Sequence, residues 1–113
     1  MRIVSKKTLR DFYEQPNYAD SKFALEAWHY EVLKRDWNNP NEIKAQYKNA
    51  SVVGDNKVVF NICGNKYRLI VKINYIAKIV FIKFIGTHKQ YDKTSENDFV
   101  QQKVSVKIKV EDL

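Results

Sequence analysis

The chain has 113 residues with a net charge of +7, and 44% of its residues are hydrophobic. This length predicts a single domain over residues 1–113, and the aromatic content of 13% indicates a folded globule, not a disordered chain. One cysteine, Cys63, excludes an intramolecular disulfide, and no run approaches the ~18 apolar residues of a membrane span. Because Met1–Lys7 lacks the apolar segment of a signal peptide, we expect a soluble, cytoplasmic protein that does not bind membranes.

The first residues predict a short strand followed by a helix. Arg2–Val4 is too short to stand alone but long enough to join a sheet. The segment Lys6–Gln15 has an apolar face at helical spacing, formed by Leu9, Phe12 and Tyr13.

A second helix is expected from Asn17, after a break at Pro16, to about Asp36. Its apolar stripe is formed by Ala24, Leu25, Trp28 and Val32. The stripe is widened by Phe23, Ala27, Tyr30 and Leu33. We therefore expect this helix to pack on a sheet. One further helical turn is expected at 41–47.

From Ser51 onward the hydrophobic period becomes that of strands. Strands are expected at 52–53, Lys57–Ile62, Tyr67–Tyr75 and Lys78–Ile85, with short turns at 54–56, 63–66 and 76–77. Such short turns require an antiparallel meander, and positive φ is expected at Gly64-Asn65. The last of these strands is apolar on both faces, which is typical of a central, covered strand.

The order β-α-α-β-β-β-β predicts an α+β domain with two N-terminal helices packed on one antiparallel sheet. Beyond a polar segment, Val104–Val110 alternates without a break between apolar and polar residues, which predicts an extra C-terminal strand. That strand would pair with an exposed edge of this sheet or with a partner chain.

The excess positive charge lies in one third of the chain. Residues 56–93 contain eight basic side chains against Asp92 alone, a net charge of +7, whereas residues 1–55 and 94–113 have +1 and −1. Concentrated positive charge is typical of proteins that bind polyanions, since phosphate contacts release counterions. A solvated, lysine-rich sheet face that resists edge aggregation is the alternative interpretation.

Strand alternation predicts which polar side chains share a face of the sheet. Arg68 lies on the same face of its strand as Lys72, and a tight hairpin would bring it close to Asn61 on the preceding strand. Arg68 would then point toward the segment Thr87–Lys93, which follows the last strand and is expected to be a loop.

This segment contains groups suited to metal-free RNA cleavage, which requires proton transfer and fixed cations at the phosphate. His88 is the natural proton-transfer group near neutral pH. Tyr91 can donate or accept a proton if Lys89 and Lys93 favour its phenolate. Arg68 is suited to bidentate phosphate binding.

Other candidate residues have simpler interpretations. A lone loop histidine is more often hydrogen-bonded than catalytic, so His88 depends on its neighbours for a functional interpretation. His29 is expected to be structural or exposed within its helix, and Cys63 a small core residue. The spacing of one cysteine and two separated histidines predicts no metal site, and no phosphate-binding glycine loop is present.

Several segments together resemble one protein family. They are Asp36–Pro40, Lys44–Tyr47, Val59–Ile62, Gly64–Leu69, Phe84–His88 and Tyr91–Lys93. In this order and spacing the chain resembles the HigB toxins, which belong to the RelE-like superfamily of type II toxin–antitoxin systems. The resemblance extends from Met1 to about Lys93 and leaves residues 94–113 outside it.

The resemblance implies a RelE-like fold and a metal-independent, ribosome-dependent mRNA endonuclease (an mRNA interferase) that uses no cofactor and inhibits translation and growth. The implied partners are mRNA on the ribosome, a helix-turn-helix antitoxin and, through the antitoxin, operator DNA. By matching positions, His88 and Tyr91 resemble the acid/base pair and Arg68 the phosphate ligand. The RNA- and phosphate-binding residues are expected to be Lys57, Asn61, Lys89 and Lys93.

Two alternatives belong to other functional classes. Relatives on the same fold inhibit DNA gyrase without catalysis and need no acid/base residues. A bare RNA-binding module would stack bases on exposed aromatics, but most aromatics here fall on apolar stripes. The combination of His88, Tyr91 and Arg68 favours the nuclease.

Overall fold

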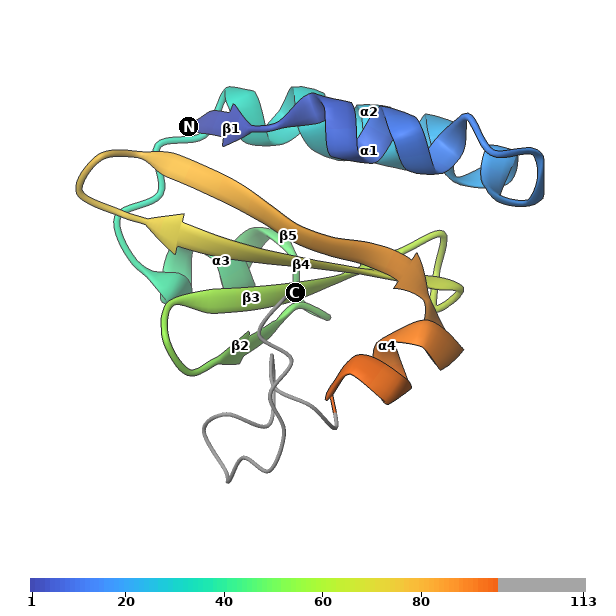
Figure 1. The fold of residues 1–113 in the computed structure, drawn as a ribbon. Coiled ribbons are helices and arrows are strands. Elements are labelled where there is room, and N and C mark those ends of the chain that lie inside the picture. The colour runs from blue at the N-terminus through green and yellow to red at the C-terminus, as the bar shows by residue number, and fades with distance from the viewer. Residues whose placement is uncertain (96–113) are drawn as a thin grey trace.

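The computed structural model describes residues 1–95 and has the α+β architecture expected from the sequence (Figure 1). The strands are β1 (Arg2–Val4), β2 (Ser51–Val53), β3 (Lys57–Ile62), β4 (Tyr67–Asn74) and β5 (Ile79–Thr87). The helices are α1 (Lys6–Tyr13), the 3-10 helix η1 (Pro16–Ser21), α2 (Lys22–Leu33), α3 (Pro40–Gln46) and α4 (His88–Ser95). The strand expected at Val104–Val110 lies outside the described residues.

The strands form one five-stranded sheet in the order β1-β5-β4-β3-β2. The meander from β2 to β5 is antiparallel, as predicted, whereas β1 pairs in parallel with the first three residues of β5. β5 is an interior strand, as expected of a strand covered on both faces, because β1 is added outside it; β4 is the middle strand of the five.

Helices α1 and α2 lie side by side over one face of the sheet, and α4 lies at the end of β5 (Figure 1). The predicted stripe of α2 is confirmed at Leu25, Trp28 and Val32, which are buried in the main core. The Trp28 ring meets the Phe60 ring of β3 edge-on, with 5.4 Å between their centroids. The main core therefore lies between this helical layer and the sheet.

The predicted widening of the α2 stripe is wrong at three of its four residues. Phe23, Tyr30 and Leu33 are 83%, 61% and 46% exposed. At about 100° per residue, Phe23 and Tyr30 point roughly opposite to the buried residue Leu25, and a helix packed on a sheet buries only one side. These side chains belong to the solvent face of the helical layer.

The helix expected at Asn17–Asp36 is shorter at both ends. At its start, η1 replaces α-helix because the Asp20 carboxylate turns toward the sheet and accepts a hydrogen bond from Tyr67 Oη at 2.5 Å. At its end, Lys78 of the β4–β5 turn pairs with Asp36 at 3.2 Å and donates to the Trp37 carbonyl at 3.0 Å. These contacts hold the residues that flank α2 outside the helix.

Both faces of β5 are apolar because both are partly covered. Ile82 and Ile85 pack against the main core, and Phe84 packs on the opposite face with Val59 and Ile70. The pairing of β4 and β5 shifts by one residue between Ile70 and Val71, which leaves Lys83 as an extra residue in the manner of a β-bulge.

The turn between β3 and β4 differs from the prediction by one residue. Positive φ occurs at Cys63 (57°) and Gly64 (68°), instead of at Gly64-Asn65.

None of the helices within residues 1–95 is long and apolar enough to cross a membrane.

Candidate active site

The segment after β5 was expected to be a loop, but it forms helix α4, which begins at His88. A reciprocal pair of hydrogen bonds fixes this start. Gln90 N–H donates to Thr87 Oγ1 at 3.1 Å, and Thr87 N–H donates to Gln90 Oε1 at 2.9 Å. This is a capping box, and its Thr-x-x-Gln signature at 87–90 is the signal that sequence reasoning missed.

Helix α4 is also tied to the rest of the molecule near its start. His88 N–H donates to the Lys66 carbonyl at 3.3 Å, and Gln90 Nε2 donates to Tyr18 Oη at 3.4 Å. Tyr18 in turn stacks on Phe12 of α1, with 4.4 Å between ring centroids. The first turn of α4 is therefore held from both the sheet and the helical layer.

Arg68 of β4 lies beside this helix start. It pairs with Asn61 on one side and Gly86 on the other, which confirms that Arg68 and Asn61 meet across the hairpin. A Cβ atom at Gly86 would lie 2.6 Å from Gln90 Oε1 and 2.7 Å from the Phe84 ring. Glycine at this position therefore lets α4 pack closely against the strand that holds Arg68.

His88 and Arg68 are in direct contact, with 2.8 Å between Arg68 Nη2 and His88 Nε2. Arginine is only a donor, so His88 Nε2 must accept and the ring proton must lie on Nδ1. His88 Nδ1 faces Asp92 Oδ2 at 3.4 Å, one helical turn further along α4. The imidazole is thus oriented by a guanidinium at one nitrogen and a carboxylate at the other, and Asp92 was not among the predicted site residues.

Tyr91 anchors α4 to the sheet face opposite the main core. It packs in a small cluster with Val59, Ile70 and Phe84, and the Arg68 guanidinium carbon lies 4.9 Å from the centre of its ring. Burial raises the pKa of Tyr91, while the nearby Arg68 charge acts in the opposite direction. The Tyr91 phenol is therefore stabilised over the phenolate. The condition set for proton acceptance by Tyr91, that Lys89 and Lys93 favour its phenolate, is not met.

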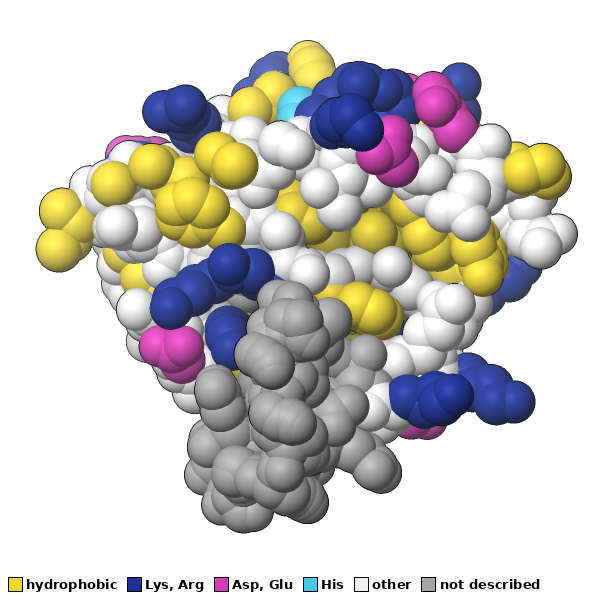
Figure 2. Space-filling model, in the orientation of Figure 1, with side chains coloured by type: hydrophobic (Ala, Val, Ile, Leu, Met, Phe, Trp, Pro, Cys, Tyr) yellow, Lys and Arg dark blue, Asp and Glu magenta, His cyan; other side chains and the backbone are white. Residues whose placement is uncertain are grey.

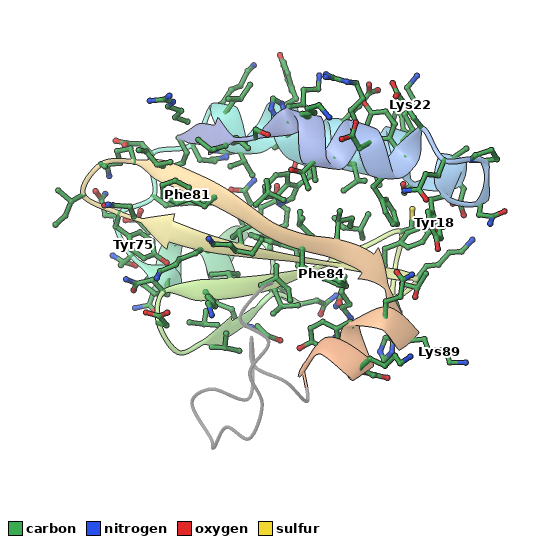
Figure 3. All side chains as sticks on the ribbon, in the orientation of Figure 1. Tyr18, Lys22, Tyr75, Phe81, Phe84 and Lys89 are labelled. Atoms are coloured by element: carbon green, nitrogen blue, oxygen red, sulfur yellow. The ribbon has the colours of Figure 1, made fainter. Side chains whose placement is uncertain are left out.

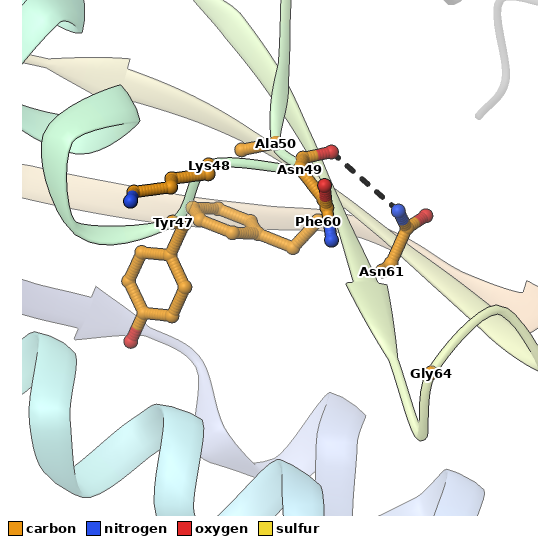
Figure 4. Close-up of a pocket in the computed structure, with 7 residues that line it drawn as sticks. All are labelled: Tyr47, Lys48, Asn49, Ala50, Phe60, Asn61 and Gly64. Atoms are coloured by element: carbon orange, nitrogen blue, oxygen red, sulfur yellow. Dashed lines mark hydrogen bonds between the residues drawn. The ribbon is translucent and has the colours of Figure 1, made fainter.

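Asn61 lines a pocket of about 280 Å³ between the end of β3 and the loop 47–50 (Figure 4). Its Nδ2 donates to the Asn49 carbonyl at 3.5 Å, so the amide points toward this loop. Lys57 lies four residues earlier on β3, about 13 Å along the strand, and is buried. The structure therefore pairs Asn61 with Arg68 in the sheet but turns its amide to the loop, and it places Lys57 at the far end of the same face.

Lys89 and Lys93 lie one turn apart on α4, and both are exposed. Figure 3 shows Lys89 pointing into solvent at the outer side of the helix. Four other lysines of the basic segment form ion pairs: Lys66 with Asp20, Lys78 with Asp36, and Lys57 and Lys72 with Asp55. Figure 2 accordingly shows basic side chains in separate groups, with hydrophobic side chains between them.

The two remaining candidates lie outside this site. His29 of α2 is partly exposed, and burial together with Lys6 lowers its pKa. Cys63 is partly buried, with Sγ 3.5 Å from the Asp20 carbonyl, and burial raises the pKa of its thiol. In the part of the chain that the structure describes, no group of three or more His, Cys, Asp or Glu side chains could hold a metal ion.

Comparison with known proteins relates the chain to one family. The family HigB_toxin, described as the RelE-like toxic component of a toxin–antitoxin system, matches residues 21–94, more than half of the chain. An mRNA interferase HigB of Escherichia coli O6:H1 is 30% identical over 95 residues, covering 82% of this chain and 90% of the relative. The mRNA interferase toxin HigB of Escherichia coli K12 is 28% identical over 94 residues, covering 81% and 88%. The chain therefore belongs to the HigB toxin family of RelE-like toxins.

Proposed function

We propose that this protein is an mRNA interferase, an endoribonuclease that acts at the site formed by Arg68, His88 and Tyr91. The observation that supports this best is the position of one guanidinium. Arg68 lies 2.8 Å from the His88 ring nitrogen and packs on the face of Tyr91. A single cation suited to a phosphate thus touches both groups that can move a proton.

The proposed reaction uses the 2′-hydroxyl of the RNA as the nucleophile. His88 Nε2 accepts the 2′-hydroxyl proton as the 2′-oxygen forms a bond to phosphorus and the bond from phosphorus to the 5′-oxygen breaks. Tyr91, kept as a phenol by burial, donates its proton to the leaving 5′-oxygen. The products are a 2′,3′-cyclic phosphate and a 5′-hydroxyl, and solvent returns the proton from His88 to Tyr91.

Arg68 stabilises the negative charge that develops on the phosphate. The Arg68 side chain is partly exposed, and His88 Nε2 engages one of the five N–H donors of its guanidinium, so donors remain for an anion. An incoming phosphate also competes with His88 Nε2 for the Arg68 donor, which frees the lone pair that the base requires. Substrate binding and base activation are therefore coupled through Arg68.

Membership of the family implies an antitoxin partner for this protein. We propose further that the substrate is mRNA engaged on the ribosome, that no metal is required, and that the antitoxin has a helix-turn-helix domain which binds operator DNA. Exposed Lys89 and Lys93 on α4, close to Arg68, support contacts to RNA phosphates. The names of the relatives describe mRNA interferases, and they lend no support to the gyrase alternative.

The test compares two histidine variants in cells, since His88 and His29 are the only histidines in the chain. On induction, His88→Ala should reduce mRNA cleavage about 10²- to 10⁴-fold, as expected for loss of a general base. His29→Ala is the matched control and should cleave like wild type. The readout is a map of new mRNA 5′ ends together with growth rate, and unchanged cleavage by His88→Ala would falsify the assignment.

A further inference from the structure

A second pocket, of about 310 Å³, lies at the β4–β5 hairpin, at the opposite end of β4 from Arg68. It is lined by Asn56, Lys72, Ile73, Asn74, Tyr75, Ile76 and Phe81. Figure 3 labels Tyr75 and Phe81 at this end of the molecule and shows α4 at the other end of the sheet. The pocket therefore takes no part in the contacts of the His88 site.

The pocket nevertheless shares a sheet face with the His88 site. Lys72 follows Arg68 by four residues on β4, so the two side chains point to the same side, about 13 Å apart along the strand. Phe81 is the cross-strand partner of Lys72 on β5, which places its ring on that face as well. A strand of RNA bound at Arg68 and running along β4 would reach this pocket.

The pocket combines an aromatic surface with positive charge. Phe81 is partly exposed, and Lys83 Nζ lies 6.0 Å from the centre of its ring. Lys72 lies 3.3 Å from Asp55, which is also 4.0 Å from Lys57, so two lysines share one carboxylate and the local charge stays positive. Aromatic rings flanked by cations are the usual means of binding unpaired bases and their phosphates.

The pocket also contains a polar group suited to a base edge. Asn74 uses its Oδ1 to accept from Ala77 N–H at 2.9 Å, and its amide can still donate through Nδ2. An Asn side chain can pair with the edge of a base that has left the stack.

We propose that this hairpin pocket binds a base of the substrate RNA that lies outside the cleaved step, with Phe81 stacking on the base and Lys72 and Lys83 contacting the flanking phosphates. The distance from Arg68 corresponds to roughly two to four nucleotides, depending on whether the strand is extended or stacked. The inference rests on the proposed function, because it requires the scissile phosphate at Arg68. It makes the hairpin a subsite that lengthens the RNA footprint.

The test measures the dissociation constants of 2′-O-methyl oligoribonucleotides of increasing length by fluorescence anisotropy, since the methyl group blocks cleavage. Phe81→Ala should weaken binding of oligonucleotides long enough to reach the pocket about 5- to 150-fold. Its affinity for a dinucleotide that reaches only Arg68 should equal that of wild type. Phe81→Trp should keep the affinity for long RNA, and Phe23→Ala is the matched control, an exposed phenylalanine on α2.

A second variant makes the test independent of packing around Phe81. Lys83→Ala changes an exposed side chain. It should reduce the slope of log affinity for long RNA against log salt concentration by the amount expected for one phosphate contact, and it should leave dinucleotide binding unchanged. If both Phe81→Ala and Lys83→Ala bind long RNA like wild type, the subsite is overturned. If these variants weaken binding of the antitoxin but leave RNA binding unchanged, the subsite is also overturned, since the pocket would then serve a protein partner.

The two proposals fail in different ways. If wild type binds and cleaves RNA, and Arg68→Ala abolishes both while Phe81→Ala changes neither, the proposed function stands and the subsite is overturned. If wild-type protein binds no free RNA of any length, the subsite is overturned, while the proposed function is judged by mRNA cleavage in cells.

Discussion

Arg68 is the residue on which the candidate site depends most. Its guanidinium contacts His88 through Nη2, packs on the Tyr91 ring and has a buried Nε with no partner among the described residues. A planar group with donors in fixed directions can do all of this at once. A lysine ammonium is a point charge and cannot stack on a ring while bonding an imidazole.

We therefore predict that Arg68→Lys behaves almost like Arg68→Ala. Cleavage should fall about 10²-fold or more in both variants, because loss of a donor at the developing charge has effects of this size. Circular dichroism should show both variants folded, since Arg68 lies outside the main core. Arg10→Lys, on the exposed side of α1, is the control and should cleave normally. Normal cleavage by Arg68→Lys would mean that only its charge matters.

At the scale of the element, α4 carries the two residues that we propose to transfer protons, and its capping box sets where it begins. Gln90→Ala removes the side chain that accepts from Thr87 N–H, and the change should destabilise the first turn by about 0.5–2 kcal/mol. Faster hydrogen exchange of α4 amides should accompany a lower cleavage rate. Gln15→Ala removes a side-chain hydrogen bond to the Asp11 carbonyl on α1 and should leave α4 and cleavage unchanged.

The strands were predictable because the hydrophobic period and the turn residues agree on them. The four strands of the meander appear within about two residues of their expected positions, and the alternation correctly placed Arg68 opposite Asn61. The grouping of the candidate site residues was predictable too, since His88, Tyr91 and Arg68 do come together. Local patterns of this kind depend on neighbours in sequence.

The errors occurred where distant contacts decide the local structure. Nothing near Asn17 in sequence indicates that Asp20 will bind Tyr67 and interrupt the helix. Likewise, the face of α2 that becomes core depends on where the sheet lies, so the exposure of Phe23 could not be read from its apolar character. Helix α4, which was expected to be a loop, is a different case, because its capping box can be read in the sequence and was overlooked.

At the scale of the whole molecule, the Asp20 carboxylate joins the helical layer to the turn before β4. The hydrogen bond from Lys66 and then that from Tyr67 lower the pKa of Asp20. A carboxyl group with a lowered pKa stabilises the fold above its unfolded pKa of about 3.9, and this contribution is lost as pH falls through the folded pKa. The link between the two layers should therefore weaken in acid.

We predict that Asp20→Asn is less stable than wild type at pH 7, and that the difference shrinks as pH falls below about 3.9 and disappears once pH is below the lowered pKa of Asp20 in the folded protein. Free energies of unfolding from urea titrations across this pH range would measure it. Tyr67→Phe keeps the charge of Asp20 but removes one hydrogen bond, so it should show a smaller change with pH. A difference between Asp20→Asn and wild type that stays constant into acid would contradict this account.

The register shift at Lys83 has a consequence for how the chain can vary in length. Ile82 and Ile85 both face the main core although they are three residues apart, which regular alternation would forbid without the extra residue. Losing Lys83 would restore regular pairing and leave Phe84, Gly86 and His88 on their present faces. Loss of Phe84 would also restore the alternation, but it would put the Lys83 side chain where the Phe84 ring now packs on Val59 and Ile70. Lys83 is thus the residue of β5 whose loss would keep both the histidine in position and the Phe84 packing intact.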